Sequence, residues 1–418
     1  MERVINVGAY LYIEGFEVKV TDLKCMVIDD LRALLVRVDT DEGVSGLAQI
    51  EMSKYAYLTP HVLFYKRYIL GQDPTDVERV MLRIRRFGGF KPWGSSVSGI
   101  EMALWDIAGK AAGVPVYKLL GGKIRDRVRA YAGGDSASRL EGTSPEDYYR
   151  HATIRKKSPE GFTIFKWGIG FHSQMAPTID NYYYGEKPLE PKQPYLYLRG
   201  HVTESGLVHT IACVKAIKEA LGDEFGLALD CGPGWTAPAA LRLAKALEPF
   251  HVMWLEDLIT GDYTPYTLPD VYRFVTQSTS TPIHTGEQVY LRQGFQGLIE
   301  KHAVDIVGPD PCDVGGIAEL KWVAEYADLH GIQIAPHGIG DGPIGLAALV
   351  QVCAALPENY IAFEFPRVDP RWHGLVKGLP NPLVREGFVE VPDKPGMGIE
   401  LNEKAVRKHL GETATYFE

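Results

Sequence analysis

The sequence predicts an α/β protein organised around a parallel barrel of the TIM type, with a smaller α+β domain beside it. Between Asp230 and Glu364, a short apolar run ending in a charged residue recurs about once every 23 to 31 positions. Helical patterns such as PAALRLAKALEP lie between these runs, so the repeating unit is strand, loop and helix. Two more runs, TIFKWG at Lys166 and VRAYAGG near Gly134, bring the number of strands to the eight that close a parallel barrel.

The apolar runs of this stretch are FGLALD, HVMWLED, TPIHTGE, VDIVGPD, IQIAPH and YIAFE. Each is apolar almost throughout, which is typical of parallel strands that are buried on both faces of a sheet. A charged residue on such a strand is therefore expected at its end. In a parallel barrel the C-terminal strand ends carry the active site, so these charges mark the face where chemistry is expected.

The composition narrows the class of protein. A length of 418 residues with 45% hydrophobic side chains suffices for a barrel core and one smaller domain. The net charge of −9 and the pI near 5.8 argue against nucleic acid or an anionic membrane surface as the main partner. No apolar window is long enough to span a membrane, and MERVINVGAY lacks the residue order of a signal peptide. We expect a soluble, cytoplasmic protein without a nucleic-acid or membrane partner.

The cysteines indicate neither a disulfide framework nor a zinc cluster. They are five in number, scattered, and never spaced CxxC. Cys231 and Cys312 adjoin charged strand ends, and we expect both to act as small packing residues rather than as catalytic thiols.

The first part of the chain predicts an α+β domain outside the barrel period. Strands are expected at VINVGAYLYIE, LRALLVRVDT and VSGLAQIE, with a turn at residues 41–43 between the last two. Between the first two strands, GFEVKVTDLKCMVIDD is expected to be a polar excursion. One helix should open with a capping box from Thr75 to Glu78, and another should run from about Ser96 to Ala112.

A specific string closes this N-terminal part: GIEMALWDIAGKAAGVPVYKLLGG, from Gly99 to Gly122. Together with the charged strand ends and PGMGIELN near the C-terminus, it resembles the mandelate racemase and muconate-lactonising branch of the enolase superfamily. The resemblance covers most of the chain. It implies a capping domain built from both chain ends, over a modified (β/α)7β barrel that lacks the last helix. Independently, the stretch after Glu364 is too rich in Pro and Gly for an ordinary helix. We expect the capping domain at 1–126, the barrel at 127–370 and the C-terminal return to the capping domain at 371–418.

One barrel interval is unusually long. Lys166 and Asp230 are 64 residues apart, whereas the other intervals are 31 residues or fewer. The excess, an insert at about 170–206, is too rich in Tyr for a typical disordered linker. Because it follows a strand C-terminal end, we expect it either at the active-site face or at a subunit contact there, and the sequence favours neither.

Three carboxylates, Asp230, Glu256 and Glu287, end three successive strands, so a barrel would place them side by side. Clustered anions repel one another unless they bind a cation, and oxygen ligands alone suit Mg²⁺ better than zinc. The alternative is a separate salt bridge from each carboxylate to a loop Lys or Arg. The family resemblance implies these same residues as the metal ligands. Asp257, beside Glu256, is expected to support the site rather than to bind the metal.

Asp310 and His337 end the next two strands. A carboxylate beside an imidazole fixes its tautomer and raises its basicity, which makes His337 a candidate general base. A structural histidine and a helix-capping aspartate are the alternatives. The resemblance implies that the two form a catalytic dyad, and that Glu364 contacts the substrate or its enolate. Lys166 ends the second strand and is expected to neutralise a substrate carboxylate.

Two departures from the family pattern bear on the reaction. The second Lys that usually follows Lys166 is replaced by Gly168, which argues against a two-base racemase. Some sugar-acid dehydratases of the family place a His two residues after the metal-binding Asp, where this chain has Gly232. The acid that protonates the leaving group therefore cannot be carried over from that motif. Candidates are His337 itself, Lys166, or a residue of the insert such as His172 or a Tyr.

The combined prediction is a Mg²⁺-dependent dehydratase, a hydro-lyase. It removes the proton α to the carboxylate of a sugar acid and eliminates the β-hydroxyl to give a 2-keto-3-deoxy acid. An epimerase, racemase or cycloisomerase with Lys166 acting on the other face is the alternative, and a non-catalytic ligand-binding protein is a second. Lys166, Glu364 and Lys24 are expected to bind the substrate. The sequence leaves the sugar open, and the resemblance favours a homo-oligomer.

Overall fold

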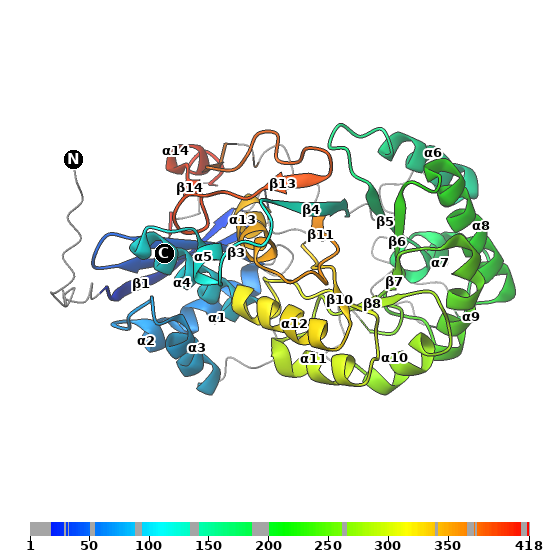
Figure 1. Ribbon diagram of the computed structural model, residues 1–418, viewed down its shortest axis with the longest axis horizontal. Coiled ribbons are helices and arrows are strands. Elements are labelled where there is room, and N and C mark those ends of the chain that lie inside the picture. Colours follow the sequence, from blue (N-terminus) through cyan, green and yellow to red (C-terminus); the bar gives the residue numbers. More distant parts are fainter. Residues whose placement is uncertain are drawn as a thin grey trace.

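The computed structural model describes residues 18–28, 31, 33–50, 55–87, 94–133, 142–185, 200–260, 266–338, 342–365, 372, 374–410 and 416–417. Two parts are visible in Figure 1: strands and helices from the N-terminal region on one side, and a curved sheet surrounded by helices on the other. The α/β fold class predicted from the sequence is confirmed.

Eight parallel strands of the described residues build the barrel. In chain order they are β4 (Arg127–Ala132), β5 (Ile164–Gly168), β6 (Gly226–Asp230), β7 (Trp254–Glu256), β8 (Ile283–Thr285), β9 (Ile306–Val307), β10 (Gln333–Ile334) and β11 (Phe363–Phe365). Each of β4 to β9 pairs in parallel with the next strand in sequence, and β11 pairs in parallel with β4. Strand β10 is connected to the segment that leads into β11 by a parallel bridge between Ile334 and Tyr360 and by the hydrogen bond from Ile361 N to Ile334 O. The strands therefore close into a ring.

The strand ends differ in detail from the predicted ones. Asp230 and Glu256 are the last residues of β6 and β7 and lie in register with each other. The strands β9 and β10 are shorter than expected, so that Asp310 and His337 lie three residues beyond them, in loops. A physical reason is that Pro residues occupy positions 309 and 336, and proline has no N–H to donate to a neighbouring strand.

Seven helices alternate with these strands. They are α6 (Pro145–Arg155), α8 (Glu204–Leu221), α9 (Ala237–Leu247), α10 (Pro269–Thr276), α11 (Leu291–Glu300), α12 (Ile317–Leu329) and α13 (Gly342–Ala354). In Figure 1 the helices α8 to α12 lie outside the curved sheet. In the described residues after β11, the sole helix is the four-residue α14 (Glu403–Val406), in agreement with the expected loss of the last barrel helix.

The barrel interior beneath the strand ends is filled by seven side chains, five of them on strands and two on residues that adjoin β10 and β11. They are Tyr131, Ile164, Ala228, Trp254, Ile306, Ala335 and Ala362. The rings of Tyr131 and Trp254 meet edge to face at 5.3 Å, and Trp254 stacks on His284 of β8 at 5.4 Å. Large rings beside three alanines fill the available volume, so the strand-end residues lie above a packed floor.

An antiparallel sheet and helices form the N-terminal part. The strands are β1 (Val20–Ile28), β2 (Ala33–Thr40) and β3 (Ser45–Ile50), and the helices are α1 (Tyr55–Phe64), α2 (Lys66–Ile69), α3 (Val77–Arg86), α4 (Ser95–Ala112) and α5 (Val116–Leu119). Helix α4 packs so closely on β3 that no side chain would fit at Gly46, where a Cβ would lie 1.9 Å from the backbone O of Ala103.

Two local predictions for this part are wrong, and one lies outside the described residues. Strand β1 occupies the stretch predicted as a polar excursion, because its apolar side chains are buried while Asp22 and Lys24 point outward. Helix α3 has Asp76 at its N-cap, and Thr75 donates to Asp73 Oδ1 at 2.6 Å, so no capping box starts at Thr75. The strand predicted at VINVGAYLYIE falls on residues outside the described part.

The C-terminal segment contacts both parts of the molecule. It contains β12 (Val376–Lys377), β13 (Phe388–Glu390) and β14 (Glu400–Leu401), and β13 pairs with barrel strand β4. Met397 N donates to Asp106 Oδ1 of α4 at 2.8 Å, and the guanidinium of Arg37 on β2 lies over the ring of Phe417. These contacts agree with a return of the chain to the N-terminal part, while the exact domain bounds stay a prediction.

The described ends of the insert pack at the C-terminal ends of β5 and β6. They include η3 (Gly170–His172), α7 (Met175–Thr178) and a bridge between Tyr183 and Val202. Tyr182 is buried, with its hydroxyl 2.7 Å from Thr210 Oγ1, and Phe171 packs on Trp235 beyond β6. This part of the insert therefore lies at the active-site end of the barrel.

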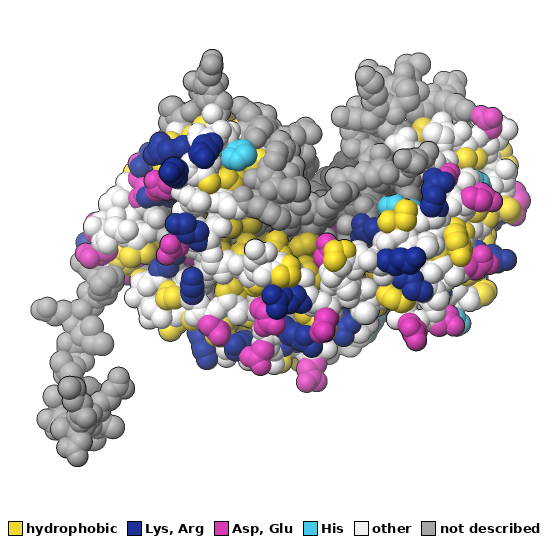
Figure 2. Space-filling model, turned by 90° about the horizontal axis from the view of Figure 1, so that it is seen from above, with side chains coloured by type: hydrophobic (Ala, Val, Ile, Leu, Met, Phe, Trp, Pro, Cys, Tyr) yellow, Lys and Arg dark blue, Asp and Glu magenta, His cyan; other side chains and the backbone are white. Residues whose placement is uncertain are grey.

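The surface carries charges of both signs. In Figure 2, basic and acidic side chains are interspersed over the visible face, without a large area of one sign among the coloured side chains. In the part of the chain that the structure describes, no helix is both long and apolar enough to cross a membrane.

Candidate active site

The structure brings the predicted strand-end residues together. The cluster consists of Lys166, Asp230, Glu256, Glu287, Asp310, His337 and Glu364, which are linked by ion pairs. All are buried except His337, which is partly exposed. Buried charges are stable only when they are paired, so the geometry of these pairs defines the site.

Lys166, on β5, lies among three carboxylates. Its Nζ is 2.5 Å from Glu256 Oε1, 3.0 Å from Glu364 Oε2 and 3.6 Å from Asp230 Oδ2. Burial alone would lower the pKa of this amine, but Glu256 and Glu364 outweigh that effect and hold its pKa well above the ordinary value. With these partners Lys166 is a fixed positive charge at neutral pH rather than a base.

Glu256 is held on both of its oxygens. Oε1 faces Lys166, while Oε2 accepts a hydrogen bond from Trp254 Nε1 at 2.9 Å and lies 3.5 Å from His284 Nδ1. Burial would raise the pKa of this carboxyl, but Lys166 and His284 lower it to about 2. Glu256 is therefore ionised, and the barrel floor holds it in place through Trp254.

His337 and Asp310 form the expected pair. His337 Nδ1 is 2.7 Å from Asp310 Oδ2, and Nε2 is 3.1 Å from Glu287 Oε2 and 3.6 Å from Glu364 Oε2. Burial lowers the pKa of the imidazole, but Glu364 and the hydrogen bond to Asp310 raise it to about 10. Because Nδ1 faces Asp310, Nε2 is the nitrogen directed at the carboxylate cluster.

Glu364 connects the two cationic groups. Its Oε2 contacts both Lys166 and His337 and also accepts a hydrogen bond from Tyr131 OH at 3.2 Å. Its Oε1 is buried and has no hydrogen-bond partner among the described residues. A buried carboxylate oxygen without a partner is costly, so a position in contact with substrate suits Glu364, as predicted.

Asp310 is held by a network that sequence reasoning missed. Cys312 N donates to Asp310 Oδ1 at 2.6 Å, and the same turn is tied to helix α4 by the hydrogen bond from Ser95 Oγ to Asp313 Oδ1 at 2.5 Å. Glu101 of α4 accepts hydrogen bonds from the first backbone N–H groups of α12. The signal available in the sequence was that Ser95 and Glu101 are polar residues on the largely apolar helix α4. Their partners could not be predicted, because they are more than 200 positions away.

The three carboxylates predicted to bind Mg²⁺ lie close together but face different cationic groups. Asp230 and Glu256 contact Lys166, whereas Glu287 contacts His337. Within the described ranges, no three His, Cys, Asp or Glu side chains are arranged to hold a metal ion. The donor chemistry does fit Mg²⁺, because five buried carboxylates share the cluster with one lysine and one histidine. Asp230, Glu256 and Glu287 could hold an ion if they turned from their present ion pairs.

Gly168 and Gly232, the two departures from the family pattern, both lie against His172. A Cβ at Gly168 would lie 2.5 Å from the backbone O of His172, and a Cβ at Gly232 would lie 2.7 Å from its Cβ. Backbone N of His172 donates to Cys231 O at 3.1 Å, and its Nδ1 is 3.4 Å from Asp230 Oδ1. Any side chain at either glycine would displace His172. The insert therefore places the imidazole of His172 beside the two positions where the family pattern has Lys and His.

The remaining predicted residues lie at the edge of this cluster or away from it. Asp257 follows Glu256 and accepts a hydrogen bond from Thr285 Oγ1 at 2.5 Å, which suits the predicted supporting role. Lys24 lies on β1 and pairs with Asp39 at 3.0 Å, so substrate binding by Lys24 stays a prediction. The five cysteines all lie in the described part of the chain, are buried and form no disulfide, and burial raises the pKa of Cys231 well above its ordinary value.

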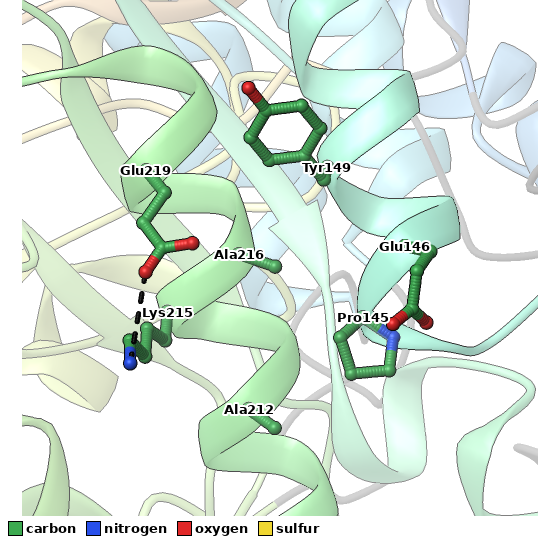
Figure 3. Close-up of a pocket in the computed structure, with 7 residues that line it drawn as sticks. All are labelled: Pro145, Glu146, Tyr149, Ala212, Lys215, Ala216 and Glu219. Atoms are coloured by element: carbon green, nitrogen blue, oxygen red, sulfur yellow. Dashed lines mark ion pairs between the residues drawn. The ribbon is translucent and has the colours of Figure 1, made fainter.

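A surface groove elsewhere on the barrel is distinct from this cluster. Figure 3 shows it between α6 and α8, the helices that cover the outside of the sheet. It is lined by Pro145, Glu146, Tyr149, Ala212, Lys215, Ala216 and Glu219. Lys215 and Glu219 pair with each other at 3.7 Å, and none of the lining residues belongs to the strand-end cluster.

Comparison with known proteins gives consistent relationships over nearly the whole chain. D-xylonate dehydratase of Haloferax volcanii is 33% identical over 413 residues, which cover 96% of this chain and 91% of that protein. The crystal structure of a mandelate racemase/muconate lactonizing enzyme-like protein from Rubrobacter xylanophilus is 34% identical, with a TM-score of 0.79, and covers 96% of this chain and 98% of that one. An enolase from Agrobacterium radiobacter, with bound Na and L-malate, is 26% identical, with a TM-score of 0.76, and covers 93% and 94% of the two chains.

Two family models match successive parts of the chain. Residues 18–121 match the mandelate racemase / muconate lactonizing enzyme N-terminal domain, and residues 150–405 match the family described as enolase C-terminal domain-like. The second match alone spans more than half of the chain. The chain therefore belongs to the enolase superfamily, in its mandelate racemase and muconate lactonizing enzyme branch, as the strand-end residues and the Gly99–Gly122 string had implied.

Proposed function

We propose that the protein is a Mg²⁺-dependent dehydratase of a sugar acid that yields a 2-keto-3-deoxy acid. The observation that carries the proposal is the pairing of His337 with Asp310 at a buried carboxylate cluster. The similarity to an enzyme named D-xylonate dehydratase supports the substrate class. A cytoplasmic location and a homo-oligomeric state stay predictions.

His337 is the proposed base that removes the α-proton. Asp310 accepts a hydrogen bond from Nδ1, so a neutral imidazole would present Nε2 as its proton acceptor. The nearby Glu364 carboxylate favours the imidazolium, and Glu287 Oε2 lies 3.1 Å from Nε2. The basic form therefore requires that these carboxylates pair with other positive charges in the substrate complex.

Fixed positive charge is needed where the substrate carboxylate becomes an enediolate. Asp230, Glu256 and Glu287 would hold Mg²⁺, whose charge stabilises the enediolate oxygens. Lys166 adds a permanent ammonium beside the same carboxylates. Removing one well-placed electrophile of this kind typically costs on the order of 10² to 10³ in rate.

Elimination completes the reaction. After α-proton removal, the electron pair of the enediolate forms the new C–C double bond and expels the β-hydroxyl, which takes up a proton and leaves as water. The enol product then tautomerises to the 2-keto acid. His337 can return its proton on the same face, and His172, next to Asp230, is a second imidazole within the site. Gly168 supplies no second base, which favours elimination over inversion.

The proposal is tested by incubating the purified full chain with Mg²⁺ and sugar acids, beginning with D-xylonate, and identifying the product by NMR. We expect a 2-keto-3-deoxy acid and loss of activity after chelation. The His337→Asn variant should form no product. Its matched control is His302→Asn, because His302 is exposed near the N-terminal end of β9 and has a φ of 46° that Asn tolerates. An α-epimer formed without loss of water, or full activity after exhaustive chelation, would overturn the proposal.

A His172→Asn variant then separates the two possible acids. If His337 alone handles both protons, the variant retains elimination. If His172 protonates the leaving hydroxyl, the variant still exchanges the substrate α-proton with solvent but forms product slowly, because His337 is unchanged.

A further inference from the structure

The side-chain amide of Gln49 is buried without a partner in the described part of the chain. Gln49 lies on β3 with no exposed surface, and neither its Nε2 nor its Oε1 has a hydrogen-bond partner among the described residues. Leaving a buried donor or acceptor unpaired destabilises a protein, and buried amides are nearly always paired. An amide with both ends unpaired therefore suggests a binding group rather than a packing residue.

The amide faces the barrel. On β3, the alternate residues Gly46 and Ile50 face helix α4. A Cβ at Gly46 would lie 1.9 Å from Ala103 O of the helix, and a Cβ at Gly99 of the helix would lie 2.5 Å from Ile50 Cγ2. Side chains alternate along a strand, so Gln49 points to the opposite face of the sheet. There, a Cβ at Gly342 would lie 2.5 Å from Gln49 Nε2 and 2.6 Å from Oε1.

This position adjoins the catalytic dyad through two separate loops. Gly342 begins α13, five residues after His337. Cys312 Sγ donates to the backbone O of Gln49 at 3.3 Å, and Cys312 N donates to Asp310 Oδ1 at 2.6 Å. Gln49 thus lies between the chain segments that follow the two dyad residues, at the active-site end of the barrel.

We propose that Gln49 is a specificity-determining residue whose amide binds a hydroxyl of the sugar acid remote from the carboxylate. An amide offers an acceptor and two donors, and a hydroxyl can donate to Oε1 while accepting from Nε2. A carboxylate or another anion would satisfy Nε2 alone. The identity of the ligand rests on the proposed function, whereas the presence of a binding group rests on the geometry of Gln49.

Gln351 provides a matched control. It is also fully buried, on α13, but its Oε1 accepts from Tyr117 N at 3.0 Å and its Nε2 donates to Pro392 O at 3.0 Å. Gln351→Leu removes two satisfied hydrogen bonds, whereas Gln49→Leu removes none. In the absence of substrate we expect Gln49→Leu to raise the thermal midpoint and Gln351→Leu to lower it.

Affinity is measured in the His337→Asn background, where the acid is not consumed, by calorimetry with Mg²⁺. The probes are D-xylonate and its analogues without the hydroxyl at carbon 4 or carbon 5. Gln49→Leu should weaken binding of the full acid by about 10- to 100-fold, as for loss of a buried hydrogen-bonded hydroxyl. For one of the deoxy analogues, the same substitution should have little effect.

Two outcomes would overturn the proposal. In the first, Gln49→Leu lowers the thermal midpoint as Gln351→Leu does, which indicates a structural role. In the second, the midpoint rises but the substitution affects the full acid and all deoxy analogues equally, which indicates that the amide pairs with water alone. Failure of D-xylonate to bind at all would contradict the proposed function instead, and the midpoints would still decide whether Gln49 is an unsatisfied binding group.

Discussion

Replacing Glu256 by Gln removes the carboxylate that lies closest to the buried Lys166 ammonium. The distance from Glu256 Oε1 to Lys166 Nζ is 2.5 Å, and both side chains are almost inaccessible to water. The amide of Gln is isosteric with the carboxylate and can still accept from Trp254 Nε1. The substitution therefore removes the charge with little change of volume.

The magnitude follows from the pKa of Glu256. A carboxyl whose pKa falls from 4.5 to about 2 on folding stabilises the native state by about 3 kcal/mol at neutral pH. Breaking a buried ion pair typically costs about 3 to 5 kcal/mol. Lys166 keeps Glu364 and Asp230 as partners, so we expect a loss of about 3 kcal/mol.

Urea unfolding in the presence of EDTA measures this loss. Because the pKa is lowered on folding, the contribution is present above pH 4.5 and disappears as the pH falls through about 2. The difference between wild type and Glu256→Gln should therefore be full at pH 7 and shrink as the pH falls below 5. Glu325→Gln, at an exposed ion pair with Lys321 on α12, is the control and should change little. A loss below about 1 kcal/mol at pH 7, or one that does not change with pH, would refute the reasoning.

Three further predictions follow from the contacts of the site. His337→Asn should abolish exchange of the substrate α-proton with solvent without unfolding the barrel; an unaltered exchange rate would identify Lys166 as the base. Asp310→Asn should lower kcat by about 10²-fold or more, because the imidazole loses its orienting carboxylate. Gly232→Ala should lower the thermal midpoint, because its φ of 62° strains an L-residue by about 1 to 2 kcal/mol and its Cβ would clash with His172; an unchanged midpoint would contradict the contact.

Much of the barrel could be predicted because the relevant signals are local. The strands are continuous apolar runs, and the functional residues follow them at regular intervals, so the fold rule alone places Asp230, Glu256 and His337 at one end. Strand length was less predictable, since Pro309 and Pro336 shorten β9 and β10. Strand β1 was misread because its outward Lys and Asp residues obscured a buried apolar face.

The supporting contacts of the site could not be predicted because they join segments that are distant in sequence. Ser95 and Asp313 are 218 positions apart, and Gln49 and Cys312 are 263 apart. His172 was a candidate from the sequence, but its position depends on close approach to Gly168 and Gly232, which no periodicity reveals. Whether a buried amide such as Gln49 is paired is likewise decided by tertiary structure alone.

The central claim is that His337 removes the α-proton of a sugar acid in a Mg²⁺-dependent elimination. It is tested most directly by NMR of the full chain with Mg²⁺ and D-xylonate in ²H₂O, with wild type and His337→Asn compared side by side. The account predicts a 2-keto-3-deoxy acid from wild type, and neither product nor loss of the α-proton signal from His337→Asn. Loss of that signal at the wild-type rate in His337→Asn, or an α-epimer as the wild-type product, would contradict it.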